Sequence, residues 1–194
     1  GTLNDSVVIK DSLENVLAAI PKDPQEIINE GGRNWLPEGG FLVLRYFDGK
    51  LGGTIKGYEG TGSSPRKWSR RPYQTINLQG DFKVERDVTV AAGACVQLLP
   101  GHENDPGIFT DTRLLPPSSG TKTVYVDGVL NISIPEGDVK GTDIEIDVPI
   151  VVRDGGVLNI YNIRSGKKVM FKKKVIVQSG GTWKFHKSSN VELY

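Results

Sequence analysis

The sequence predicts an all-β fold, a right-handed parallel β-helix or solenoid of about four to five coils with a small N-terminal α+β cap. Three observations support this. Short strands with alternating apolar residues recur along the second half, glycine turns join them, and the period is about 25 residues. The 24 glycines and 11 prolines among 194 residues fit a chain with many turns, and they show no collagen-like period.

The repeat consists of four segments, each with a short strand, a glycine turn and a second short strand. They are Val88–Leu98, Val124–Ile132, Ile150–Ile160 and Val175–Phe185. Because alternate side chains of a strand lie on one face, these segments predict four inward columns of apolar residues. The columns are Val88, Val124, Ile150 and Val175; Val90, Val126, Val152 and Val177; Val96, Leu130, Leu158 and Trp183; and Leu98, Ile132, Ile160 and Phe185.

A third short strand precedes three of the four segments, so each coil is expected to have three faces. The apolar pairs that mark it are Phe82 with Val84, Ile144 with Ile146, and Val169 with Phe171. Val191 and Leu193 are expected to begin one more coil. An antiparallel sandwich also has short alternating strands, but it gives no reason for like residues at matching positions of successive units. We therefore favour stacked coils, with the right hand usual for parallel connections.

The chain is expected to divide at residue 73, with a cap region at 1–73 and the solenoid at 74–194. Two capping-box patterns predict short helices in the cap region: Asp11 with Glu14, and Asp23 with Glu26. Helices this short are not stable alone, so we expect them to cover the exposed end of the solenoid rather than bind a partner.

A β-hairpin and a basic loop complete the cap region. Phe41–Phe47 and Thr54–Tyr58 are β-prone runs separated by glycines, which predicts the hairpin. The loop interleaves cations with aromatic side chains: Arg66, Trp68, Arg70, Arg71 and Tyr73. Arginine pairs with carboxylate, sulfate or phosphate, and aromatic rings stack on ligands, so the loop is a candidate binding site. The alternative is a solvated linker whose tryptophan packs on the neighbouring domain.

A second candidate site lies in an insertion. The interval from Val88 to Val124 exceeds the others by about ten residues, and the excess falls in Pro100–Gly120. Its candidate binding residues are His102, Glu103, Asp105, Asp111 and Arg113. A histidine among carboxylates can ligate a metal or act as an acid or base, but the spacing matches no metal motif. We therefore predict binding, with no catalytic residue and no metal ligand.

Other charged groups have ordinary structural explanations. Asp127 and Asp154 occupy equivalent turns with Arg153 beside them, as turn residues commonly do. A lysine run includes Lys167, Lys168 and residues 172–174. It fits a solvated edge that keeps the stack soluble, and the alternative is a cationic strip for acidic glycans.

Three stretches carry a resemblance to known proteins. Val88–Leu98 has the pattern V-x-V-x-x-G-x-x-V-x-L, Val126–Ile132 has V-D-G-x-L-x-I, and Ile150–Ile160 has I-x-V-x-x-G-G-x-L-x-I. The repeat resembles the right-handed parallel β-helix superfamily, which includes pectate-lyase-like enzymes, phage tailspikes and surface adhesins. Asp87–Tyr161 is similar to the extracellular eight-glycine domain of cell-surface hyaluronidases and fibrocystin-like receptors. This resemblance implies a secreted or cell-surface protein in a polysaccharide-rich setting, without a defined reaction.

Charge, cysteine content and motifs exclude several functions. A net charge of +1 provides no field for nucleic acid, and no apolar stretch is long enough for a transmembrane helix. The single cysteine, Cys95, excludes a disulfide framework within the chain and a cysteine zinc site, and fits a small packed apolar residue. No phosphate loop, dinucleotide fingerprint or serine elbow is present. We expect no cofactor.

These observations predict a non-catalytic secreted or cell-surface module that binds polysaccharide or a partner protein, with homo-oligomers left open. One alternative is a carbohydrate-active enzyme, a polysaccharide lyase or glycoside hydrolase, with its site in the insertion. Another is a segment of a phage or virion fibre, which is normally a trimer.

Overall fold

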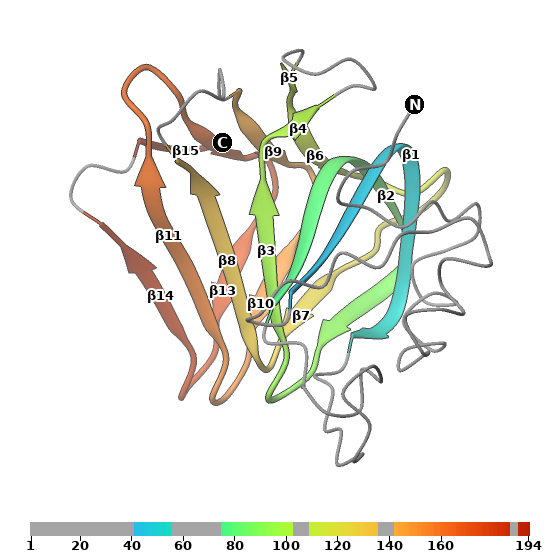
Figure 1. Cartoon of the computed structure of the whole chain (residues 1–194). Helices are drawn as coiled ribbons and strands as arrows, with labels where there is room; N and C mark the ends of the chain where they lie inside the picture. Colours follow the sequence, from blue (N-terminus) through green and yellow to red (C-terminus); the bar gives the residue numbers. More distant parts are fainter. Residues whose placement is uncertain (1–40, 56–74, 103–108, 136–141, 187–189) are drawn as a thin grey trace, which may run out of the picture.

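The computed structural model describes residues 41–55, 75–102, 109–135, 142–186 and 190–194, and all regular structure in these ranges is β-strand. The strands form one curled, parallel sheet that winds as a β-helix, with a separate two-stranded pair beside it (Figure 1). The two predicted helices and the basic loop lie outside the described residues. Within those ranges, no helix has the length and apolar character needed to cross a membrane.

Strands of successive coils stack into three faces. Face 1 contains part of β2 (Thr75–Val90), β3 (Cys95–Leu99), β8 (Val129–Ile134), β11 (Val157–Ile163) and β14 (Thr182–Phe185). Face 2 contains part of β2, β6 (Thr112–Leu115), β9 (Ile144–Ile146), β12 (Val169–Phe171) and β15 (Val191–Leu193). Face 3 contains part of β2, β7 (Val124–Val126), β10 (Ile150–Val152) and β13 (Val175–Val177).

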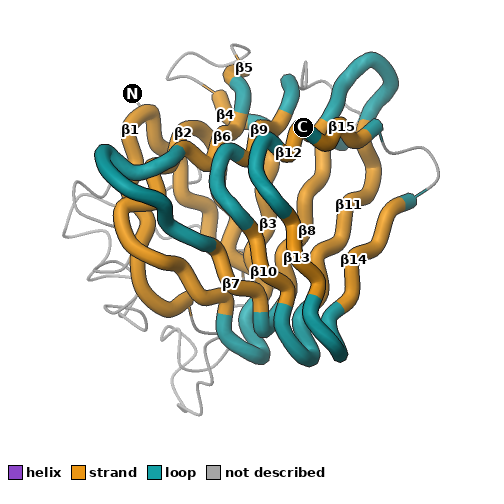
Figure 2. The backbone as a smooth tube through the Cα atoms, turned by 180° about the vertical axis from the view of Figure 1, so that it is seen from behind, coloured by secondary structure: helices purple, strands orange, loops and turns teal. Residues whose placement is uncertain are grey.

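The coils advance along a right-handed path, as predicted. In Figure 1 the face 1 strands run upward in front, face 3 lies behind, and successive coils step from right to left. Figure 2 shows face 3 from its own side, with β7, β10 and β13 next to one another. β15 confirms the further coil predicted from its two apolar residues.

The first two described strands each run through all three faces. β1 (Phe41–Ile55) pairs in parallel with β2 from end to end, and β2 pairs in turn with β3, β6 and β7. The hairpin predicted from Phe41–Phe47 and Thr54–Tyr58 is therefore wrong over the described residues, because the chain does not reverse there. Its glycines bend one strand around corners, and β1 adds to the solenoid. The division at residue 73 stays a prediction, since residues 56–74 are not described.

The predicted columns form the core. Every column member from Val88 to Ile160 is at most 3% exposed, and each buried methylene stabilises the fold by about 0.8 kcal/mol. The last residue of each column is less buried than predicted. Val177 is 41% and Phe185 49% exposed, whereas Val175 and Trp183 pack partly against the core. No described strand stacks on these four residues.

The turn from face 3 to face 1 needs glycine because neighbouring coils meet there. A Cβ on Gly156 would lie 2.0 Å from the carbonyl oxygen of Val126 in the coil before it. A Cβ on Gly128 would lie 2.2 Å from the carbonyl oxygen of Ala91. Any side chain at these two positions would push the coils apart.

The insertion is shorter than predicted. β4 (Gly101–His102) and β5 (Phe109–Thr110) form an antiparallel pair at the corner between faces 1 and 2 (Figure 1). The second half of Pro100–Gly120 was wrongly assigned to the insertion, because β6 belongs to face 2. The buried hydroxyl of Thr112 donates to the Leu99 carbonyl and accepts a hydrogen bond from the Gly80 N–H (3.1 Å). These bonds anchor the base of the insertion.

Candidate functional site

A band of amide side chains crosses the outer surface of face 1. Asn77, Gln97, Asn131 and Asn159 hold the same register position on β2, β3, β8 and β11, and Lys184 continues the row on β14. We call these five residues the amide band. Neighbouring strands lie about 4.8 Å apart, so the band offers one polar side chain per coil at that spacing.

The amides are only partly satisfied by one another. Asn159 Nδ2 donates to Asn131 Oδ1 at 3.3 Å, and Asn131 Nδ2 points to the weakly accepting Cys95 Sγ at 3.5 Å. The Oδ1 atoms of Asn77 and Asn159 are buried and accept no hydrogen bond within the described residues. All four amide residues are half-buried, and an amide can donate twice and accept twice, so the amide atoms that reach the surface retain hydrogen-bonding capacity. Cys95 is half-buried on this outer surface rather than packed in the core.

Tyr161 lies across the band. Gln97 Nε2 donates to its hydroxyl at 2.7 Å, although β8 separates their two strands. Tyr161 stands opposite Ser133, which is buried, and the next residue, Asn162, has no partner in the ladder and a φ of +51°. Asparagine tolerates this left-handed conformation. Such a bulge re-aims neighbouring side chains, which explains how Tyr161 reaches back over face 1.

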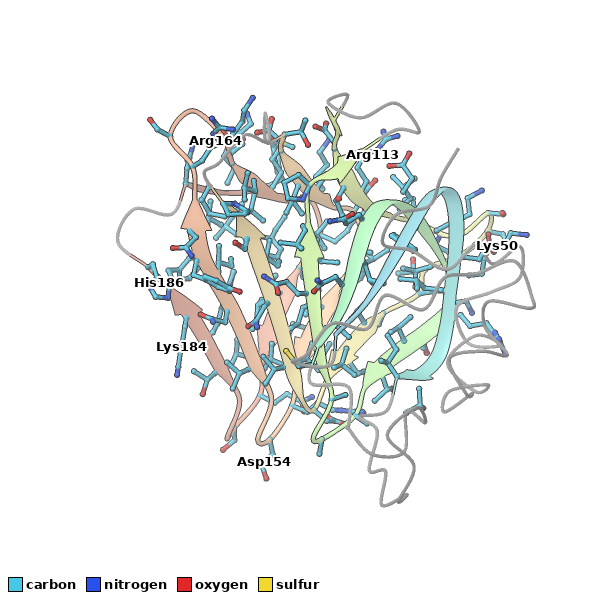
Figure 3. The ribbon with its side chains drawn as sticks, in the orientation of Figure 1. Lys50, Arg113, Asp154, Arg164, Lys184 and His186 are labelled. Atoms are coloured by element: carbon cyan, nitrogen blue, oxygen red, sulfur yellow. The ribbon has the colours of Figure 1, made fainter. Side chains whose placement is uncertain are left out.

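An aromatic and cationic border completes the site. The ring of His186 lies 6.0 Å from that of Tyr161, tilted by 58°. His186 and Lys184 are both exposed, and Figure 3 shows them together at the β14 margin of face 1. Burial is the main cause that raises the pKa of Tyr161 above its ordinary value; the charge of Cys95 adds to this, and the Gln97 hydrogen bond opposes it. Tyr161 is therefore a neutral hydroxyl at physiological pH.

The residues predicted as binding sites are not part of this band. Seven of them lie outside the described residues: Arg66, Trp68, Arg70, Arg71, Tyr73, Glu103 and Asp105. For His102 the backbone is described, but the side chain is not. Asp111 is exposed just before β6, and Arg113 lies on the outer surface of face 2. Their role in binding stays a prediction.

Arg113 makes a two-pronged ion pair across face 2. Its guanidinium donates to both carboxylate oxygens of Asp81, at 2.9 and 2.5 Å. The hydrogen bond to Asp81 is the main cause that raises the Arg113 pKa, and the charges of Asp81, Glu145 and Asp111 contribute. This arrangement ties β2 to β6, so Arg113 has a structural partner in addition to any ligand.

The lysine run is largely neutralised on the same face. Lys168 pairs with Glu192 at 3.1 Å, Lys172 with Glu145 at 2.7 Å, and a longer contact of 3.8 Å joins Lys173 to Asp147. The hydrogen bond to the carboxylate is the main cause that raises the pKa of Lys168 and of Lys172. These contacts favour the solvated-edge interpretation over a cationic strip.

The acidic turns are also structural. Arg153 donates to both oxygens of Asp127, at 2.7 and 2.8 Å, and lies 4.5 Å from the ring centroid of Tyr125. Asp154 is exposed at the tip of its turn (Figure 3). The described ranges contain no group of three or more histidine, cysteine, aspartate or glutamate side chains placed to hold a metal ion.

The recurrence of an amide at one position of successive repeats is visible in the sequence. Strand alternation predicts only that these residues face outward, and not that they form a site. The place of Tyr161 depends on the bulge at Asn162, and alternation alone does not predict a bulge.

Comparison with known proteins gives no assignment, because no protein-family model, no curated protein and no solved structure matches this chain.

Proposed function

We propose that this protein is a non-catalytic, extracellular or cell-surface module that binds a polysaccharide along face 1. The amide band is the observation that carries the proposal. A linear polysaccharide presents hydroxyl groups at regular intervals, and each hydroxyl both donates and accepts. A polymer lying along the solenoid axis would therefore meet a matching amide at every coil.

The border of the band supports the same ligand class. Tyr161 and His186 provide ring surfaces for the apolar faces of sugar rings, with polar atoms at their edges. Lys184 stands at the end of the band, where it suits a carboxylate or sulfate substituent. The similarity of Asp87–Tyr161 to the extracellular eight-glycine domain favours a polysaccharide-rich setting.

The test is binding of the purified chain to a panel of neutral and acidic polysaccharides, measured by affinity electrophoresis and calorimetry. The double variant Asn131→Ala/Asn159→Ala loses hydrogen bonds worth about 1 kcal/mol each, so its affinity should fall roughly 30-fold. Tyr161→Ala should also weaken binding. Tyr125→Ala is the matched control, because Tyr125 is an outward tyrosine on face 3.

Two results would contradict the proposal. Affinity that is unchanged in the face 1 variants but lost in Arg70→Ala/Arg71→Ala would move the site to the basic loop. Cleavage of a polysaccharide that disappears when Glu103, Asp105 and Asp111 are replaced by alanine would identify the chain as a carbohydrate-active enzyme.

A further inference from the structure

The central residue of the amide band lies in a sequence motif that polysaccharide binding does not explain. Residues 131–133 read Asn-Ile-Ser, which has the form Asn-x-Ser with x other than proline. This triplet is the acceptor signal for N-linked glycosylation in secreted proteins. The other two asparagines of the band, Asn77 and Asn159, have no serine or threonine two residues later. Asn131 is therefore the member of the band that can be modified.

The place of Asn131 in the fold leaves room for a sugar. Asn131 is half-buried and lies on the outer surface of face 1, in the interior of β8. Its neighbours along β8 on the same surface are Val129 and Ser133, which both have short side chains. A glycan is attached to the side chain, so the pairing of the β8 backbone with β3 and β11 does not have to change.

The Asn131 amide also has a hydrogen that its contacts do not use. Nδ2 points to Cys95 Sγ at 3.5 Å, and Oδ1 accepts from Asn159 Nδ2 at 3.3 Å. An amide nitrogen carries two hydrogens, and glycosylation replaces one of them. Both contacts within the band can therefore persist after a sugar is attached.

Tyr161 provides a surface for the first sugar. It starts on β11 opposite Ser133, and its hydroxyl accepts from Gln97 Nε2 at 2.7 Å. Gln97 lies opposite Asn131 on β3. The Tyr161 side chain therefore crosses β8 beside Asn131, where its ring can pack against the apolar face of a sugar ring.

We propose that Asn131 is an N-glycosylation site and that its glycan regulates binding at face 1. The inference rests on the extracellular location in the proposed function, because this modification requires entry into a secretory pathway. Asn131 Nδ2 forms a bond to the anomeric carbon of a lipid-pyrophosphate-linked oligosaccharide and releases one proton. The bond from that carbon to the pyrophosphate oxygen breaks, and the lipid pyrophosphate leaves with the electron pair.

The glycan competes with the polysaccharide for the same surface. It projects from the centre of the amide band and blocks the path of a polymer along the solenoid axis. The transferase must reach the serine of the triplet, but Ser133 is only 2% exposed in the folded chain. Attachment therefore precedes the pairing of β8 with β3 and β11. The extent of attachment then sets the fraction of the secreted chain that binds polysaccharide.

The first test is secretion of the 194-residue chain from cultured mammalian cells behind a signal peptide. Peptide mass spectrometry, after peptide N-glycosidase treatment in heavy-oxygen water, should find labelled aspartate in place of Asn131. Asn131→Gln and Ser133→Ala should abolish this label. Asn159→Gln is the matched control, since Asn159 lies opposite Asn131 on β11 and has no acceptor signal; this variant should keep the glycan. Circular dichroism checks that each variant is folded.

A second triplet, Asn4-Asp5-Ser6, lies outside the described residues and is mapped in the same experiment. Its peptide is analysed separately, so a glycan there is not mistaken for one at Asn131. An unmodified Asn131 in the secreted wild-type chain would overturn the proposal, whether or not Asn4 is modified.

The second test compares three preparations on the same polysaccharide panel: the wild-type chain from bacterial cytoplasm, the glycosylated wild-type chain and secreted Ser133→Ala. The glycosylated chain should bind roughly tenfold or more weakly than the other two, because the glycan covers hydrogen-bonding groups of the band. Equal affinity of all three would refute the regulatory role. No binding by the bacterial chain would refute the proposed function and the regulatory role together, whereas the glycan at Asn131 is decided by the first test.

Discussion

One column of the core contains four valines: Val90, Val126, Val152 and Val177. The same Val→Ala substitution can therefore be compared at a buried and at a partly exposed position of one column. Val126→Ala removes two buried methyl groups from a residue that is fully buried. Their transfer is worth about 1.6 kcal/mol, and the cavity left behind raises the loss to about 2.5 kcal/mol. For a chain of this size the melting temperature should fall by roughly 5–10 °C.

Val177→Ala should cost less than about 1 kcal/mol, because 41% of Val177 is already exposed. Thermal unfolding followed by circular dichroism and calorimetry measures the difference. Equal losses at the two positions would refute the reasoning, because the cost of the substitution would then not follow the burial of the valine side chain.

Three further predictions concern the turns and the site. Gly156→Ala should destabilise the fold by about 3 kcal/mol or more in chemical denaturation, because its Cβ would overlap the carbonyl oxygen of Val126; a near-neutral result would contradict the close approach of the coils. Asp127→Asn should cost no more than about 1 kcal/mol and less in high salt, since its partner Arg153 is more than one-third exposed. The raised pKa of Tyr161 contributes stability that is fully present below the ordinary value of 10.0 and is lost as the pH rises through the folded-state pKa. The difference in unfolding free energy between wild type and Tyr161→Phe should therefore narrow at high pH, and phenolate absorbance should show one late-ionising tyrosine fewer in Tyr161→Phe than in wild type.

The stacked coils were predictable because every coil must place apolar side chains at the same inward positions. A coil adds apolar side chains to existing columns, so positions such as Val126 and Val152 carry like residues, and the period is visible in the sequence. The glycine turns were visible for a related reason. Gly156 stands where two coils meet, and only the smallest residue fits there.

Features that depend on contacts between distant residues were not predictable. The glycines of β1 have the composition of a hairpin turn, and only pairing with β2 shows that they bend a strand around a corner. β6 was missed because Thr112 interrupts the apolar alternation; its hydroxyl is satisfied by Leu99 and Gly80, which lie on other strands. The amide band with Tyr161 was not predicted as a site, since the orientation of Tyr161 follows from the bulge beside it.

The corners of the solenoid differ in how freely they can change during evolution. The links from face 1 to face 2 vary widely in length, as between Leu99 and Thr112, Ile134 and Ile144, or Ile163 and Val169. Those from face 3 to face 1 are confined by glycines packed against the coil before them. Extra residues at the first corner can project into solvent without shifting any column. New recognition loops can therefore be gained or exchanged along that one ridge, and peptide grafts placed there should leave the scaffold intact.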